Sequence, residues 1–467
     1  MLNEATDFTP AERVARGRAA RAELPRSVHA DWQPRPLRRN PVELLEEQAT
    51  TRLPELIPIR YGRMLESPLA FYRGGASLMA ADLSAGPRTG LLVQLCGDAH
   101  LSNFGVFAAP DRRLVFSIND FDETLRGPFE WDVKRLAASL AVAGREFGFD
   151  DAQRRAMVTG TVREYRTAMT RFAAMRTIDV WYARLDVAGL TARFSSKASP
   201  KQMKRLQRSI APTRTKDSIR ALTKLCTAVD GELRIVGHPP LITPIEGVLP
   251  GAEQEHLEDT IRHMIGAYAR SLPHDRRSLL ESYRYVHAAR KVVGVGSVGT
   301  RAWILLLVGR DHSDPLFLQF KEAQASVLEP YLGHSEFDQH GQRVVEGQRM
   351  MQAASDIMLG WERVVTIDGE TRDFYVRQLW DEKASAEIEL MDAAGLAAYG
   401  RVCGWTLARA HARSGDRIAI AAYLGSRDPF DRAMASFAET YADQNERDHS
   451  ALRTAVESGT VEARTGI

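Results

Sequence analysis

Two short segments decide the fold predicted from this sequence. They are Gly97-Asp98-Ala99-His100-Leu101-Ser102-Asn103-Phe104-Gly105 and, about twenty residues later, Ile118-Asn119-Asp120-Phe121-Asp122-Glu123. Each follows an apolar run, at residues 91–95 and 114–118, that predicts a strand. Asp98, Asn103 and Asp120 therefore lie in loops at strand ends, where proteins usually display reactive groups.

These three residue types, in this order, suit phosphoryl transfer. One carboxylate can orient and deprotonate a hydroxyl group, while an amide and a second carboxylate hold magnesium. Asp122 and Glu123 follow Asp120 closely, and such an acidic cluster is hard to stabilise without a cation. Asp122 could add to the metal site or cap the next turn.

The two motifs resemble the catalytic loop and the metal-binding Asp motif of the protein-kinase-like superfamily. The closest resemblance is to aminoglycoside and choline phosphotransferases. It implies that Asp98 is the catalytic base, that Asn103 and Asp120 are magnesium ligands, and that ATP is the donor. His100 belongs to the same catalytic loop, and we expect it to brace that loop rather than to bind metal.

A further match follows at residues 127–136, where Asp132 corresponds to an Asp that opens a helix and braces the catalytic loop in those phosphotransferases. This sequence departs from their pattern at Cys96, where they usually have His, so another group is expected to supply that bracing. The whole chain also resembles a bacterial family of unknown function that shares both motifs.

A glycine-rich stretch, Gly294-Val295-Gly296-Ser297-Val298-Gly299, lies nearly two hundred residues after the catalytic loop. The run Trp303–Val308 that follows is too apolar on every side for a surface helix, which predicts a strand. The glycine loop then joins two antiparallel strands, as a loop that folds over phosphates does in kinases. On its own the pattern also fits a plain hairpin.

Lys321 ends the next predicted strand, and the resemblance makes it the phosphate-binding Lys. Glu346, in a helix predicted over residues 343–359, is the best candidate for its ion-pair partner, with Glu329 and Glu336 as rivals. The strand at residues 374–379 would lead to the hinge that holds adenine.

The order of these parts is unusual, because the glycine loop of ordinary kinases precedes the catalytic loop. The helix predicted at residues 402–412 resembles the one that normally comes just before that loop. We therefore predict an α+β, two-lobed, kinase-like fold that is circularly permuted. The expected units are an arm at 1–40, a helical catalytic segment at 41–285, a β-rich nucleotide lobe at 286–380 and a closing helical segment at 381–467.

Length and composition fit a folded protein of two or three structural units. The chain has 467 residues, of which 44% are hydrophobic and 26% charged, and its net charge is +2. Three well-separated cysteines are typical of reduced thiols, and neither a signal peptide nor a membrane span is evident, so we expect a cytoplasmic protein. A basic stretch at residues 193–224 favours a solvated face or a phosphate-attracting rim over a nucleic-acid partner.

The sequence leaves several functions open. The first is an ATP- and magnesium-dependent phosphotransferase with an unidentified small-molecule or protein acceptor. The second is a kinase-like regulator that binds nucleotide with little turnover, and transfer of AMP is a variant of the first. A metallophosphoesterase also uses Gly-Asp-x-His, but it needs further His-bearing loops, and His238 and His411 are too isolated to supply them.

Overall fold

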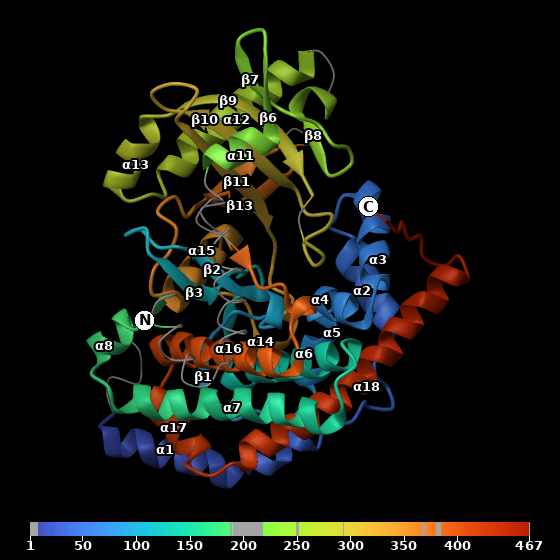
Figure 1. The fold of residues 1–467 in the computed structure, drawn as a ribbon, viewed down its shortest axis with the longest axis vertical. Helices are drawn as coiled ribbons and strands as arrows, with labels where there is room; N and C mark the ends of the chain where they lie inside the picture. Colours follow the sequence, from blue (N-terminus) through green and yellow to red (C-terminus); the bar gives the residue numbers. More distant parts are fainter. Residues whose placement is uncertain are drawn as a thin grey trace.

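A computed structural model describes residues 8–186, 189, 218–248, 252–292, 294–366, 369–379 and 384–466. The fold is mixed α+β, with an upper unit built on a large sheet and a lower, mainly helical unit (Figure 1). Most of the basic stretch at 193–224 and the expected adenine hinge after residue 379 lie outside the described residues. In the part that is described, no helix combines the length and apolarity needed to cross a membrane.

The upper unit is an antiparallel sheet of six strands in the order β8-β9-β10-β11-β13-β12. Their bounds are β8 Ile242–Pro244, β9 Arg284–Lys291, β10 Ala302–Val308, β11 Pro315–Ala323, β12 Gly360–Val365 and β13 Thr371–Gln378. Four helices, α11 Ser218–Leu225, α12 Ala252–Ala269, α13 His274–Glu281 and α15 His340–Met351, and the hairpin β6 Cys226–Val229 and β7 Glu232–Ile235, surround it.

The continuous apolar run in β10 is explained by burial of both faces of this sheet. Leu305 and Leu307 pack in one cluster with residues of α12, whereas Ile304 and Leu306 pack in another with Ala221 of α11. Successive side chains of a strand point to opposite faces, so a strand covered on both sides has no polar alternation. The sequence prediction of a strand here is confirmed.

The upper unit begins earlier than residue 286, the boundary expected from sequence. Strand β8 pairs with β9, and Tyr268 of α12 packs against Phe320 of β11. Residues 218–281 were expected in the catalytic segment, but the apolar faces of the described helices in this range cover the large sheet.

The lower unit is built around α6 Phe129–Glu146, in which every residue from Phe129 to Gly144 is buried. A helix that is apolar or satisfied on all sides belongs in a core. Around it lie α1 Pro10–Glu23, α7 Asp151–Ala174, α8 Thr177–Tyr182, α16 Ala393–Ser414, α17 Arg417–Leu424 and α18 Pro429–Glu457. Four shorter helices, α2 Pro41–Ala49, α3 Ile57–Leu65, α4 Pro68–Gly74 and α5 Ala76–Ser84, form a side wall near α18 (Figure 1).

Two small sheets carry the decisive motifs between the units. Strand β1 Leu92–Leu95 pairs with β4 Leu125–Pro128, and a second sheet has the order β14-β2-β3-β5. Its strands are β14 Ala384–Ser385, β2 Phe104–Ala108, β3 Leu114–Ile118 and β5 Leu185–Asp186, and a short helix, α14 Glu329–Leu332, packs near β4. The strands predicted at 91–95 and 114–118 are present, whereas β2 and β4 were not predicted.

The helix predicted at residues 343–359 ends early, at Met351. The carboxylate of Asp356 accepts hydrogen bonds from the backbone N–H groups of Met358, at 2.8 Å, and of Gln378 in β13. An Asp that bonds to nearby backbone offers the chain an alternative to helix, which accounts for the loop before β12.

Arg343 joins the two units. It lies on α15 and is almost fully buried; its guanidinium donates to the carbonyl oxygens of Thr124, Asp122 and Gln324 at 2.7, 2.8 and 2.7 Å. Two of these carbonyls belong to the acidic loop of the lower unit, so α15 is hydrogen-bonded directly to that loop.

We predict that Arg343→Met destabilises the protein by on the order of 3 kcal/mol or more, because three buried carbonyl groups lose their donor. Urea unfolding followed by circular dichroism measures this change. Arg310→Met, at a site where the side chain is 78% exposed, is the control and should change stability little. Equal stability of the two variants would contradict a bridging role for Arg343.

Candidate active site

The loop that carries Asp98 is fixed by a buried carboxylate from the neighbouring helix. Asp132, in the first turn of α6, accepts hydrogen bonds from the backbone N–H groups of Cys96 at 2.8 Å and Gly97 at 3.1 Å. Gly97 has a φ of +83°, and a Cβ there would lie 2.3 Å from the carbonyl oxygen of Glu123. Only glycine therefore allows the two motif loops to approach each other so closely.

The imidazole that the sequence lacks at position 96 comes from elsewhere in the chain. His411 of α16 lies with its Nε2 3.2 Å from Asp132, and its Nδ1 is 2.8 Å from the hydroxyl of Tyr165. His411 is fully buried, so these two polar contacts satisfy both ring nitrogens. From sequence, His411 was placed in the helix predicted at residues 402–412 and judged too isolated for a metallophosphoesterase site, and its contact with Asp132 was not expected.

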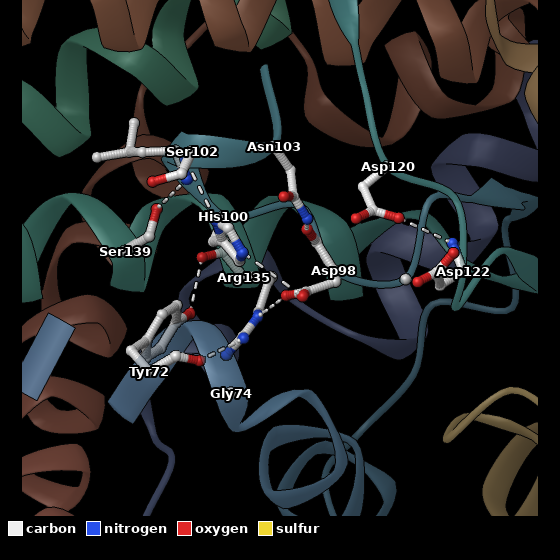
Figure 2. A network of polar contacts seen from close by, with 12 residues as sticks. Tyr72, Gly74, Asp98, His100, Ser102, Asn103, Asp120, Asp122, Arg135 and Ser139 are labelled. Atoms are coloured by element: carbon white, nitrogen blue, oxygen red, sulfur yellow. Dashed lines mark hydrogen bonds and ion pairs between the residues drawn. The ribbon is translucent and has the colours of Figure 1, made fainter. Parts of the chain in front are cut away.

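Asp98 is held by a residue that sequence reasoning missed. Arg135, one helical turn after Asp132, donates from Nε to the Asp98 carboxylate at 2.8 Å. Its guanidinium lies 3.9 Å from the ring centroid of Tyr72 and also donates to the Tyr72 carbonyl at 2.6 Å. Figure 2 shows Arg135 between Tyr72 and Asp98, so the carboxylate is oriented by a charge that is itself fixed.

His100 lies beside the same carboxylate. Its Nε2 is 3.6 Å from Asp98, and its Nδ1 accepts a hydrogen bond from the Ser102 backbone at 3.2 Å (Figure 2). Burial lowers the pKa of His100 to about 4, although the charge of Asp98 opposes this change. A neutral imidazole that accepts a backbone bond shapes the loop.

Asn103 and Asp120 extend the site from the ends of neighbouring segments. The Asn103 amide donates to the Asp98 carbonyl at 2.7 Å, and the Asn119 backbone N–H donates to the Asn103 carbonyl at 2.8 Å. Asp120 accepts a hydrogen bond from the backbone N–H of Asp122 at 3.2 Å (Figure 2). The pairing of β2 with β3 sets this arrangement, because Phe104 is opposite Ile118.

Lys321 pairs with Asp122, and not with Glu346, Glu329 or Glu336. Its ammonium group donates to Asp122 and, at 2.7 Å, to the hydroxyl of Ser297, while Tyr375 donates to the other Asp122 oxygen at 2.8 Å. Glu346 instead lies 3.0 Å from Arg349. Lys321 is only 2% exposed, so a charge partner at this site is a physical requirement.

This ion pair determines the charge state of both groups. Burial alone would raise the pKa of Asp122, but the charge of Lys321 and hydrogen bonds from Lys321 and Tyr375 lower it to about 2. Burial would lower the pKa of Lys321, and the attraction of Asp122 outweighs it and raises that pKa. Both groups are therefore charged at neutral pH.

Glu123 completes the acidic segment. Its carboxylate accepts a hydrogen bond from the Val327 backbone at 2.7 Å, and burial raises its pKa to about 7. Glu123 thus differs from its sequence neighbour Asp122, because no Lys or Arg side chain of the described residues lies within hydrogen-bond distance of its carboxylate.

The glycine loop lies over this site, between the antiparallel strands β9 and β10. It is held from the side wall, where Arg52 donates to the Val298 carbonyl and the Leu53 backbone donates to Gly299 at 2.8 Å. Gly299 has a φ of +92°, and a Cβ there would lie 2.9 Å from the Arg52 side chain.

One cavity of about 300 Å³ gathers most residues predicted for the site. The side of its lining formed by the two motif loops includes Asp98, His100, Asn103, Asp120 and Asp122, and the glycine-loop side includes Gly294, Gly296 and Ser297. Gly299 and Lys321 do not line it, although Lys321 contacts Asp122 and Ser297, which do. Glu346 lies on α15 and takes no part in these contacts.

The oxygen atoms of Asp120 and Asn103 suit a hard cation that is bound weakly by the protein alone. No group of three or more His, Cys, Asp or Glu side chains in the described ranges is arranged to hold a metal unaided. Magnesium usually binds through one or two carboxylates, water and substrate phosphates, and Asp120 with Asn103 could supply the protein part of such a shell.

We predict that the low pKa of His100 makes stability depend on pH. The unfolded chain binds a proton near pH 6.5 and the folded chain only near pH 4, so stability is lost as pH falls between these values. The loss should be on the order of 3 kcal/mol at pH 4 and absent in His100→Gln. Denaturant unfolding across this range, with His312→Gln in an exposed turn as control, checks it; parallel profiles for parent and His100→Gln would contradict it.

Comparison with known proteins adds the family. No curated protein and no solved structure gives a significant match to this chain. A family model described as "Uncharacterized protein conserved in bacteria (DUF2252)" matches residues 52–455, which include both motif loops, the glycine loop and His411. The chain therefore belongs to this conserved bacterial family.

Proposed function

We propose that this protein is an ATP-dependent phosphotransferase that uses magnesium and a hydroxyl acceptor. The observation that carries the proposal is the single cleft lined by Asp98, Asn103, Asp120 and the glycine loop, with Lys321 behind its wall. A carboxylate base, a metal-binding pair, a backbone cradle for phosphates and a buried lysine are the parts that kinases use.

Each part has a distinct role in this proposal. Asp98 accepts the proton of the acceptor hydroxyl through the oxygen that does not bond to Arg135, while Arg135 keeps the carboxylate in place. Asp120 and Asn103 hold magnesium, which, together with ATP, supplies the charge neutralisation and the phosphoryl group. Lys321 and the backbone N–H groups of the glycine loop contact the nucleotide phosphates.

The permuted, two-lobed, kinase-like architecture is part of the same proposal. It is supported by the course of α16, whose end lies against β1: Ser414 accepts a hydrogen bond from the Gln94 backbone at 3.2 Å, and a Cβ on Gly415 would lie 2.8 Å from the Leu92 carbonyl. In an unpermuted kinase-like chain the corresponding helix comes just before the catalytic loop. Here the same proximity joins residues more than three hundred positions apart.

A nucleotide-binding regulator is the second candidate. The observation in its favour is that the Ser297 hydroxyl lies 2.7 Å from Lys321 and 3.3 Å from Asp122, so the glycine loop contacts the lysine that is assigned to the phosphates. Nucleotide would have to displace this contact. A measurement of ATP turnover distinguishes the enzyme from the regulator. Identification of the product distinguishes transfer of phosphate from transfer of AMP.

We predict that Asp98→Ala leaves ATP affinity nearly intact and lowers turnover by about 10²–10⁴, because a base acts on the acceptor. Lys321→Ala should weaken ATP binding as well. Calorimetry measures binding, and basal ATP hydrolysis in magnesium is the first measure of turnover. Asp311→Ala, in an exposed turn, is the control; if Asp98→Ala turns over like the parent, the loop is structural and the regulator replaces the enzyme.

We also predict that Asp120→Asn reduces magnesium-dependent ATP binding more than Asp122→Asn, because an amide cannot replace the negative charge of a metal ligand. Asp122→Asn should instead lower thermal stability, since it leaves Lys321 buried without its counter-charge. Titration of ATP with and without magnesium into both variants, alongside thermal unfolding, checks this. Equal magnesium dependence would point to a different ligand set.

A further inference from the structure

The side wall formed by α2 to α5 contributes two arginines to the cleft. Arg52 follows α2, Arg73 lies in α4, and both line the cavity that contains Asp98 and the glycine loop. Neither residue was singled out by sequence, because a helical segment with scattered arginines is ordinary. Their surroundings, however, leave the Nε atom of each guanidinium group without a hydrogen-bond partner among the described residues.

Arg52 is 7% exposed, and the only hydrogen bond that its side chain makes to a described residue is the one from Nη1 to the Val298 carbonyl. Its Nε is buried without a partner, and so is the Nε of Arg73. No carboxylate of a described residue forms an ion pair with either group. A buried guanidinium without an ion-pair partner, such as that of Arg52, costs free energy unless an anion binds it, and the half-buried Arg73 lies on the same cavity.

A third arginine lies behind this wall. Arg60 is fully buried and donates from Nη2 to Gln48 at 2.6 Å and to the Gly74 carbonyl at 3.3 Å, while its Nε and Nη1 lack partners among the described residues. Gln48 and Gly74 themselves line the cavity. Burial and, secondarily, the charge of Arg52 lower the pKa of Arg60 to about 9, as expected where like charges gather.

Arg52 and Arg73 lie near both the glycine loop and the catalytic loop. Arg52 contacts the glycine loop through Val298, and the Arg73 carbonyl lies 3.4 Å from where a Cβ of Gly296 would be. The charge of Arg73 also contributes to the lowered pKa of His100, beside Asp98. The two arginines therefore lie between the glycine loop and the catalytic loop.

We propose that Arg52 and Arg73 form an oxyanion-binding subsite, which takes a phosphate or carboxylate group of a ligand in the cleft. Guanidinium groups bind such groups through paired N–H donors, which suits a planar or tetrahedral oxyanion better than it suits a neutral ligand. Two sources can supply the group: the terminal phosphate of the nucleotide, or an acid group on the acceptor. The assignment of these sources rests on the proposed phosphotransferase function, whereas the subsite itself does not.

The test is calorimetric titration of inorganic phosphate into the parent protein and into Arg52→Gln, Arg73→Gln and Arg18→Gln. Arg18 is exposed on α1 and does not line the cavity, so its replacement controls for the loss of one charge. Phosphate should bind about tenfold more weakly to the first two variants, a loss of about 1.4 kcal/mol, and unchanged to the control. Circular dichroism checks folding, and Arg73→Gln, at a less buried side chain, carries the test if Arg52→Gln unfolds. Absent binding to the parent, or equal binding to Arg73→Gln, would overturn the subsite.

The same titration with saturating magnesium and nucleotide identifies the source. Phosphate that still binds with ADP, but is displaced by a non-hydrolysable ATP analogue, assigns the subsite to the terminal phosphate. Phosphate that binds with both nucleotides assigns it to an acid group of the acceptor. If no nucleotide binds while phosphate binding still depends on Arg73, the phosphotransferase proposal is wrong and the subsite is supported. If nucleotide binds but the affinity for phosphate is unchanged in both arginine variants, the subsite is wrong and the phosphotransferase proposal is not contradicted.

Discussion

The buried carboxylate of Asp132 is the group on which the geometry of the cleft depends. It is 1% exposed, and it meets backbone donors from the Asp98 loop and an imidazole from α16. A carboxylate with so little access to water is stable only when such donors surround it. Asp132 is in turn the acceptor for the backbone N–H groups of Cys96 and Gly97 in that loop. The helix, the loop and α16 are thereby fixed relative to one another.

The acidic loop is held from both sides by the upper unit. Its carboxylate at Asp122 faces Lys321 and Tyr375 of the large sheet, and its carbonyl groups at Asp122 and Thr124 face Arg343 of α15. If the sheet moved relative to the lower unit, these contacts would break unless the acidic loop moved with the sheet. Lys321, which suits a phosphate, and the acidic loop, which suits a cation, are consequently joined by a hydrogen bond.

Much of the fold could be predicted from local sequence patterns. The predictions that were wrong concern contacts between segments that are distant in the sequence. Strand β10 follows from its continuous apolar run, and the helix predicted at residues 402–412 lies within α16. The pairing of residues 218–281 with the large sheet depends on which apolar faces meet, and no local pattern reports that. The early end of α15 depends on Asp356, whose carboxylate bonds to a strand twenty-two residues away.

The candidate site likewise contains residues that sequence motifs identify and residues that only tertiary contacts reveal. Asp98, Asn103, Asp120, Gly294 and Gly296 stand in motifs whose chemistry is visible in the sequence, and they line one cavity. Their supporting residues, Arg135, His411 and the arginines of the side wall, could not be found, because each acts across a tertiary contact. Glu346 illustrates the limit: an acid on the expected helix was a reasonable partner for Lys321, but the lysine reaches the nearer Asp122.

The position of α18 has a consequence for how the chain can fold during synthesis. Arg38 bonds to Asp82 and also to Asp448 of α18, 410 residues further along, and Asn445 of α18 donates to the Pro68 carbonyl at 2.8 Å. At the usual speed of translation, the helices of the side wall would wait roughly 20 to 80 seconds for these partners to emerge. During that interval the apolar residues that later pack against Leu452, among them Leu44 and Met64, have no cover from α18. A chain that ends before α18 is complete would thus expose apolar side chains on these helices and become a target for chaperones and proteases.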